Sequence, residues 1–203
     1  MLYLHINKIN KKITMKRRNA LNVKKVFVDE IKLGNNAVIA PKWCLSEPDD
    51  DMGNNIILDT RLGWYQIFRY EVDYGRNELG SRDKKTKAIE ISYKNMPEVE
   101  RKNLQFEETD NLEADEMVYL FDYAYVKKNL RDEEGCCSDE WEDKMYDLTH
   151  FDNKRPYDKV NGYYICDDRG IAIGINGYGR MLISVAESGD KVVAIRIIFK
   201  ENY

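Results

Sequence analysis

The chain has 203 residues, 43% apolar and 33% charged, with four cysteines and a formal net charge of −4. This length suits one domain, which needs neither a disulfide nor a metal ion to fold. No run of about 18 apolar residues is present, which excludes an ordinary membrane-spanning helix. The N-terminus lacks a signal-peptide pattern, so we expect a cytoplasmic protein with free thiols and no cofactor. The abundance of Lys, Asn, Ile and Tyr indicates a bacterial or phage gene.

Charge is distributed unevenly along the chain. Residues 1–25 hold eight Lys and Arg and no acid, so we expect a flexible basic arm over 1–22 and a single domain over 23–203. Residues 107–147 hold fifteen acids and four bases, which accounts for nearly all of the negative charge. The sequence leaves open whether residues 1–14 belong to the native protein.

The N-terminal half is typical of short strands. Runs rich in β-branched and aromatic residues are separated by Gly, Pro, Asn and Asp, the residues that favour turns. The predicted strands cover residues 26–28, 31–33, 37–40, 56–58 and 88–93.

The middle of the chain is predicted to be helical. Asn95-Met96-Pro97-Glu98 marks the start of a short helix. A longer helix is predicted over 112–130, where apolar residues recur at spacings of three and four behind a start resembling a capping box at Asp110 and Glu113. A third is predicted from Asp139 to Leu148. The apolar residues of the long helix are Ala114, Met117, Val118, Phe121, Ala124 and Tyr125.

The C-terminal part is predicted to be a β-meander. Turns are expected at 167–170, at Asn176-Gly177, a strong type I′ hairpin signal, and at 188–190. Together these patterns predict an α+β fold, in which the strand-rich N-terminal half and the C-terminal β-meander form an antiparallel sheet and the central helical segment packs on it.

Two short motifs superficially resemble ligand loops. Residues 174–179 read G-x-x-G-x-G and precede a strand, whereas a dinucleotide loop reads G-x-G-x-x-G and opens a helix. The loop that begins with Asp49, Asp50 and Asp51 lacks the Gly and Glu that a calcium loop needs at its sixth and twelfth positions. We therefore expect no metal site and no phosphate loop.

The acidic block is the most informative feature for function. Carboxylates on the exposed face of a helix create a negative field that attracts basic partners, as in immunity, anti-restriction and anti-defence inhibitors. The leading hypothesis is therefore a non-catalytic inhibitor of a basic protein, such as a nuclease or another nucleic-acid-binding protein. The expected partner-binding residues are Asp139, Glu140, Glu142, Asp143, Tyr146 and Asp147.

Two other function classes remain open. The first is a small enzyme or ligand-binding domain, with a pocket between the sheet and helix 112–130 lined by Asp122, Tyr123, His150 and Tyr164. In it His150 and Asp122 are the only catalytic candidates, since the chain has just two histidines. The second is a structural subunit of a larger assembly. Direct nucleic-acid binding is not expected, because the basic arm lacks interleaved aromatic residues and the rest of the chain is acidic.

Overall fold

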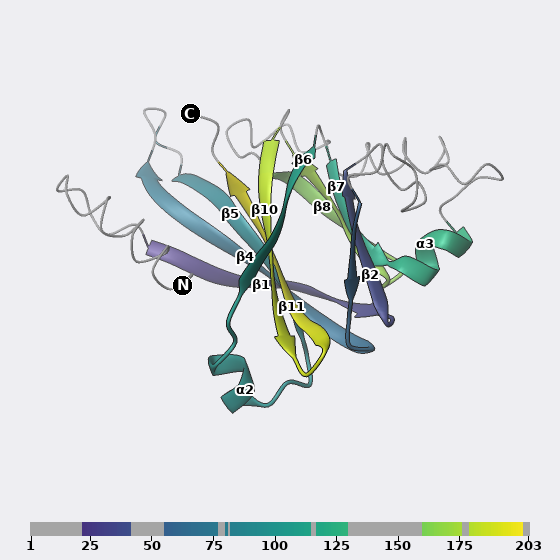
Figure 1. Cartoon of the computed structure of the whole chain (residues 1–203). Coiled ribbons are helices and arrows are strands. Elements are labelled where there is room, and N and C mark those ends of the chain that lie inside the picture. Colours follow the sequence, from purple (N-terminus) through teal and green to yellow (C-terminus); the bar gives the residue numbers. More distant parts are fainter. Residues whose placement is uncertain are drawn as a thin grey trace.

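The chain forms two antiparallel β-sheets, as a computed structural model shows for residues 22–41, 55–76, 80, 82–114, 117–129, 160–175 and 179–200. Figure 1 shows the sheets as two layers, with two short helices at their periphery. The described chain is 74% strand and 10% helix. The predicted α+β fold is therefore wrong, because the helices are too short to form a layer.

The two sheets differ in size. Sheet A has the spatial order β1 (Asn22–Leu33), β4 (Gly63–Arg76), β5 (Arg82–Tyr93), β11 (Lys191–Lys200), β10 (Gly179–Ser188) and β6 (Glu107–Ala114). Sheet B has the order β3 (Ile56–Asp59), β2 (Asn36–Pro41), β7 (Met117–Asp122), β9 (Gly170–Ile175) and β8 (Val160–Cys166). Helix α2 (Glu98–Lys102) follows β5, and α3 (Tyr123–Asn129) follows β7. In the part of the chain that the structure describes, no helix has the length and apolar character needed to cross a membrane.

The main core lies between the sheets. A cross-strand row of sheet A contains Ile67, Ile91, Ile195 and Val185, and a row of sheet B in the same core contains Ile39, Leu120 and Ile171. All seven side chains are buried. Each such side chain stabilises the fold by roughly 1.5–3 kcal/mol. Branched side chains pack well on a pleated surface, which explains why these runs form strands.

Strand β7 is buried on both faces, and this corrects the helix predicted over 112–130. Val118 and Leu120 belong to the core between the sheets, whereas Tyr119 and Phe121 belong to a second buried cluster on the opposite face of sheet B. A strand that is buried on both faces shows no polar alternation, so its apolar run also fits the helical spacing. Among the described residues of this range, the seven of α3, after β7 ends, are helical.

The chain passes between the two sheets through four short links. Their residues are 34–35, 60–62, 115–116 and 176–178. The hairpin predicted at Asn176-Gly177 is therefore wrong: β9 belongs to sheet B and β10 belongs to sheet A. The meander is split between the sheets, because the buried faces of β9 and β10 lie on opposite sides of the shared core.

Other local predictions are confirmed. The turns at 167–170 and 188–190 join paired strands, β8 with β9 and β10 with β11. Asp167 and Asp168 adopt φ of 45° and 54°, a left-handed conformation that Asp tolerates in tight turns. The short helix predicted after Asn95 is α2, although Pro97 rather than Asn95 occupies its N-cap. The alternation of β11 holds, with Ile195 and Ile197 in the core.

Candidate functional site

The predicted partner-binding residues, Asp139 to Asp147, lie outside the described residues, as does His150. Of the acidic block, the structure describes 107–114 and 117–129. The first of these segments is β6, so Asp110 and Glu113 stand on a strand and do not cap a helix. Acidic side chains of this segment nevertheless lie on the surface, because β6 is at the edge of a sheet.

Strand β6 presents carboxylates at one edge of sheet A, where β10 is its only neighbour among the described strands. Five consecutive residues, Glu107–Asn111, are exposed. Successive side chains of a strand point to opposite faces, so neither face of this half of β6 is covered. We call Glu107, Glu108 and Asp110 the acidic edge.

The acidic edge is not neutralised by the cations described around it. Glu113, closer to sheet B, forms an ion pair with Arg180 on β10. Glu107, Glu108 and Asp110 form no ion pair with any residue in the described ranges. Lys200 Nζ donates to the side-chain oxygen of Asn111 on the same strand at 2.7 Å. The edge therefore carries a local negative charge toward solvent.

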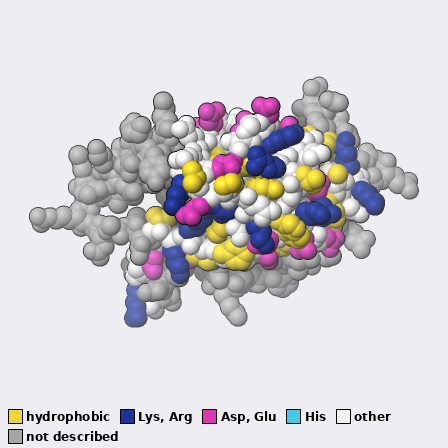
Figure 2. All heavy atoms as spheres, turned by 90° about the horizontal axis from the view of Figure 1, so that it is seen from below, with side chains coloured by type: hydrophobic (Ala, Val, Ile, Leu, Met, Phe, Trp, Pro, Cys, Tyr) yellow, Lys and Arg dark blue, Asp and Glu magenta, His cyan; other side chains and the backbone are white. Residues whose placement is uncertain are grey.

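The face of the molecule on the α2 side carries mixed charge. Figure 2, a view from below Figure 1, shows hydrophobic side chains interleaved with Lys and Arg and with Asp and Glu over the described surface. No single sign covers this face. Recognition on it must therefore depend on local groups of side chains, of which β1, β4 and β5 hold the most distinctive.

Aromatic and basic side chains alternate across these three strands, on the face of sheet A that points away from sheet B. Phe27 packs edge-to-face on Phe68, with ring centroids 5.9 Å apart, and Lys25 Nζ lies 4.1 Å from the centroid of Phe68. The Nζ atoms of Lys85 and Lys87 lie 5.3 and 5.4 Å from the ring centroid of Tyr74. We call this group the aromatic–basic face: Lys25, Phe27, Phe68, Tyr70, Tyr74, Lys85 and Lys87.

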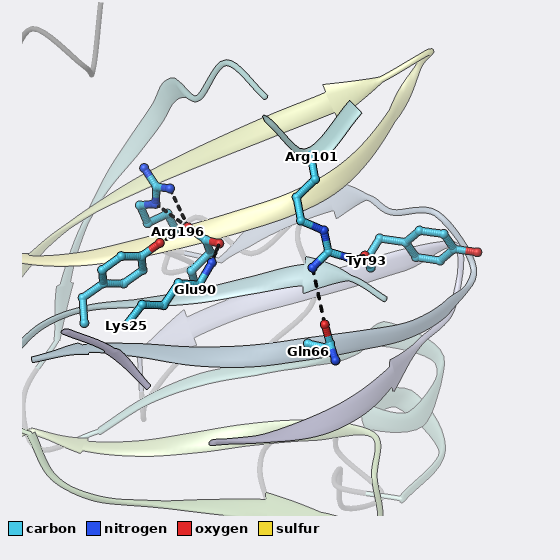
Figure 3. Close-up of polar contacts among 7 residues, drawn as sticks. Lys25, Gln66, Glu90, Tyr93, Arg101 and Arg196 are labelled. Atoms are coloured by element: carbon cyan, nitrogen blue, oxygen red, sulfur yellow. Dashed lines mark hydrogen bonds and ion pairs between the residues drawn. The ribbon is translucent and has the colours of Figure 1, made fainter. Parts of the chain in front are cut away.

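A buried carboxylate organises the inner border of this face. Glu90 on β5 is only 5% exposed. It accepts hydrogen bonds from Lys25 Nζ at 2.7 Å, Tyr70 Oη at 2.8 Å and Arg196 Nε at 3.0 Å, and Figure 3 shows the cationic side chains converging on it. The guanidinium of Arg196 also lies 3.7 Å from the ring centroid of Phe106. The cluster thus ties β1, β4, β5 and β11 together.

The charges of this cluster shift its ionisation. Burial by itself raises the pKa of the Glu90 carboxyl, but the charge of Arg196 and the hydrogen bond from Lys25 outweigh burial and hold the pKa below its ordinary value. Burial, followed by the negative charge of Glu90, raises the pKa of the Tyr70 hydroxyl far above its usual range. Glu90 is therefore ionised, and Tyr70 neutral, at any physiological pH.

Helix α2 is held against sheet A beside this cluster. Figure 3 shows the side chain of Arg101 reaching from the helix toward the ends of β4 and β5. Its Nη2 donates to the carbonyl oxygens of Lys94 at 3.0 Å and Tyr93 at 3.3 Å, and its Nη1 donates to Gln66 at 3.4 Å. The helix thus has a structural anchor, while Val99 on its far side is 74% exposed.

Of the predicted pocket residues, Asp122 has structural partners and Tyr123 packs beside a buried cluster. Asp122 caps α3: its Oδ1 accepts from the backbone N–H of Ala124 at 2.9 Å, and its Oδ2 pairs with Arg169 at 3.3 Å. Tyr123 is half-buried beside the second cluster of sheet B, and Tyr164 lies in β8. The structure brings Asp122 and Tyr123 together only as chain neighbours.

A buried thiol lies near this helix. Cys166 is a buried thiol, 4% exposed. Tyr125 Oη lies 3.4 Å from its sulfur and donates to Asp167 Oδ2 at 2.6 Å. Burial, followed by the hydrogen bond to Asp167, raises the pKa of Tyr125 far above its usual range. The hydroxyl therefore serves as a neutral donor that fixes the β8–β9 turn.

Sequence reasoning missed the aromatic–basic face, because its members come from three strands that are distant along the chain. A usable signal was the period-two pattern of Phe68, Tyr70 and Tyr74 on β4, matched by Lys25 and Phe27 on β1. Such alternation places side chains on one face of a strand. No protein-family model, curated protein or solved structure matches the chain.

Proposed function

We propose that this chain is a non-catalytic binding protein that engages a basic protein partner through its acidic surface, in the manner of an immunity or anti-defence inhibitor. The observation that carries the proposal is the acidic edge, Glu107, Glu108 and Asp110, which stands exposed and without ion pairs among the described residues. It belongs to a block of fifteen acids and four bases over 107–147.

An edge strand offers two kinds of contact to the same partner. A basic segment laid along β6 extends sheet A and forms main-chain hydrogen bonds, while its Lys and Arg side chains pair with the acidic edge. The acids at 139–147 in the sequence add to the negative charge of the chain. A negative field raises the association rate of a basic partner and disfavours acidic ones.

The test starts with recovery of the partner from host lysate on the tagged full-length chain, at low salt and at about 0.5 M salt, where the screening length falls well below 10 Å. The recovered protein is then purified, and its affinity is measured by calorimetry. We expect a basic partner whose binding weakens as salt rises. The triple variant E107K/E108K/D110K is expected to bind at least tenfold more weakly.

A matched control separates the acidic edge from net charge. The variant D29K/E98K/D190K makes the same change in net charge at three exposed acids outside β6, and it is expected to keep its affinity within about twofold. The second test variant reverses Asp139, Glu140, Glu142, Asp143 and Asp147. If neither test variant binds more weakly than the control, the acidic surface is not the binding site and the proposal fails.

A further inference from the structure

Two aromatic rings of the aromatic–basic face are displayed to solvent. Phe27 is 53% exposed and Tyr74 is 41% exposed. Neither ring is part of the main core: Phe27 packs on Phe68, over which Lys25 lies, and Tyr74 lies under Lys85 and Lys87. Exposed aromatic rings leave apolar surface in contact with water, and exposed apolar patches that are bordered by polar residues commonly mark binding sites.

The face is locally positive even though the chain is acidic. The acids described on this side of β1, β4 and β5 are each paired with cations: Glu90 with Lys25 and Arg196, and Glu30 with Lys94. The acids of the neighbouring part of β4, Glu71 and Asp73, occupy alternate positions, so their side chains leave the strand on the opposite face. The face thus combines several cations with solvent-exposed rings.

The sequence carries further positive charge just before β1. The chain enters β1 at Asn22, directly after a segment that holds Lys8, Lys11, Lys12, Lys16, Arg17 and Arg18 and no acid. That segment lacks aromatic residues among its cations, which weighed against nucleic-acid binding in the sequence alone. The structure supplies the missing rings on the strand that this segment precedes.

We propose that the aromatic–basic face binds single-stranded nucleic acid, with bases stacked on Phe27 and Tyr74 and phosphates contacted by Lys85 and Lys87. Rings on a sheet stack on unpaired bases, whose faces are hidden in a duplex, and cations track the backbone. An acidic protein segment would satisfy the cations but would leave the rings without matching partners. The site is separate from the acidic edge, because β1 and β6 lie at opposite edges of sheet A.

The test measures the fluorescence anisotropy of a labelled 15-nucleotide single strand, as DNA and as RNA, with the full-length chain at about 50 mM salt. We expect saturable binding that a duplex of the same sequence competes for at least tenfold less well. Phe27→Ala and Tyr74→Ala are each expected to weaken binding about tenfold, which is the order expected for loss of one stacked base. Val99→Ala, at an exposed apolar residue of α2, is the matched control and is expected to bind as the unchanged chain does.

The salt dependence tests the cations separately. A plot of log K against log salt concentration has a negative slope, and its magnitude is expected to decrease by about 0.7 for each contact with a phosphate of the single strand that is removed. For the K85A/K87A variant the magnitude of this slope is therefore expected to be smaller by about 1.4, since two contacts at about 0.7 each are removed. For Lys102→Ala, on α2, the slope is expected to be unchanged. Thermal melting of each variant confirms that the fold is kept.

Three results would overturn the proposal. The first is no binding of any single strand at 50 mM salt, and the second is equal affinity in the two aromatic variants and the control. The third is self-association in sedimentation that Phe27→Ala abolishes while oligonucleotides remain unbound, which would assign this face to a second copy of the chain. Reversing the acidic edge is expected to leave oligonucleotide affinity undiminished, so failure here leaves the proposed function standing.

Discussion

Replacing Glu90 by Gln removes one buried charge without changing the side chain's shape. In the native cluster both carboxylate oxygens accept hydrogen bonds, one from Lys25 and the other from Tyr70 and Arg196. An amide has a single acceptor oxygen, so in either orientation its NH₂ group faces donors. The change also leaves the Arg196 side chain, 16% exposed, without its counter-charge.

The loss of unfolding free energy in Glu90→Gln depends on whether the cations that pair with Glu90 can be rehydrated. Breaking a buried ion pair from one side costs roughly 3–5 kcal/mol. The Lys25 side chain is 40% exposed and can be rehydrated, so we expect the lower end, about 3 kcal/mol of unfolding free energy. For a chain of this size that corresponds to a fall in Tm of about 6–12 °C. Urea unfolding followed by circular dichroism gives the free energy directly.

Glu98→Gln provides the control. Glu98 pairs with Lys102 across one turn of α2, and their side chains are 79% and 73% exposed. Exposed pairs of this kind contribute about 0.5 kcal/mol or less. If Glu90→Gln destabilises the chain by less than about 1 kcal/mol, or by no more than Glu98→Gln does, the cluster is not the structural tie described above.

The pH dependence gives an independent check of the same cluster. The folded-state pKa of Glu90 lies below its ordinary value of 4.5, so its charge stabilises the fold above about pH 4.5 and this contribution is lost as the pH falls through the lower, folded-state pKa. The difference between the unchanged chain and Glu90→Gln is therefore expected to be constant from pH 7 to about 5 and to shrink on further acidification. A difference that grows in acid contradicts the assignment.

Three further substitutions probe other parts of the fold by urea unfolding. Gly170→Ala is expected to cost more than about 3 kcal/mol, because its Cβ would lie 2.0 Å from the ring of Phe121, whereas Gly179→Ala, whose Cβ meets only ordinary contacts, is expected to cost under about 1 kcal/mol; similar costs would contradict the packing. Tyr65→Phe is expected to cost about 1–2 kcal/mol, because it removes the single hydroxyl donor shared by the backbone carbonyls of Arg61 and Val192 at 2.8 and 3.0 Å, and an unchanged midpoint would refute this. Asp122→Ala is expected to cost about 2 kcal/mol, because it removes both the cap of α3 and the ion pair with Arg169, whereas Asp122→Asn keeps a capping oxygen and is expected to cost less; equal costs would exclude the cap as a contributor.

The local pattern of the C-terminal strands was predictable because each has one face on the main core. In β11, Ile195 and Ile197 point inward and alternate with Arg196, and the following side chains keep that period. The turn at 188–190 was also readable from its composition. What the pattern does not carry is which sheet a strand joins, so the hairpin signal at Asn176-Gly177 predicted a pairing that the topology does not contain.

Strand β7 shows the opposite case. Its run from Met117 to Phe121 is buried on both faces, so neither period two nor period 3.6 is distinctive. Only the β-branched and aromatic composition favoured a strand, and the acids before it favoured a helix start. For the aromatic–basic face, the period-two pattern could show which side chains share a face of β1 or of β4, but not that Phe27 and Phe68 are neighbours, because that depends on the register of the two strands.

The four short links between the sheets have a consequence for how the chain folds. Each link joins two strands that are successive in sequence and belong to different sheets, so neither sheet can be completed before the other has begun. Contacts between residues that are far apart in the sequence make folding slow. A structure that contains only part of both sheets lacks most of the core between them. The two layers are therefore expected to form and melt as one cooperative unit, and excising either sheet would leave a fragment with half a core and no route to a stable state.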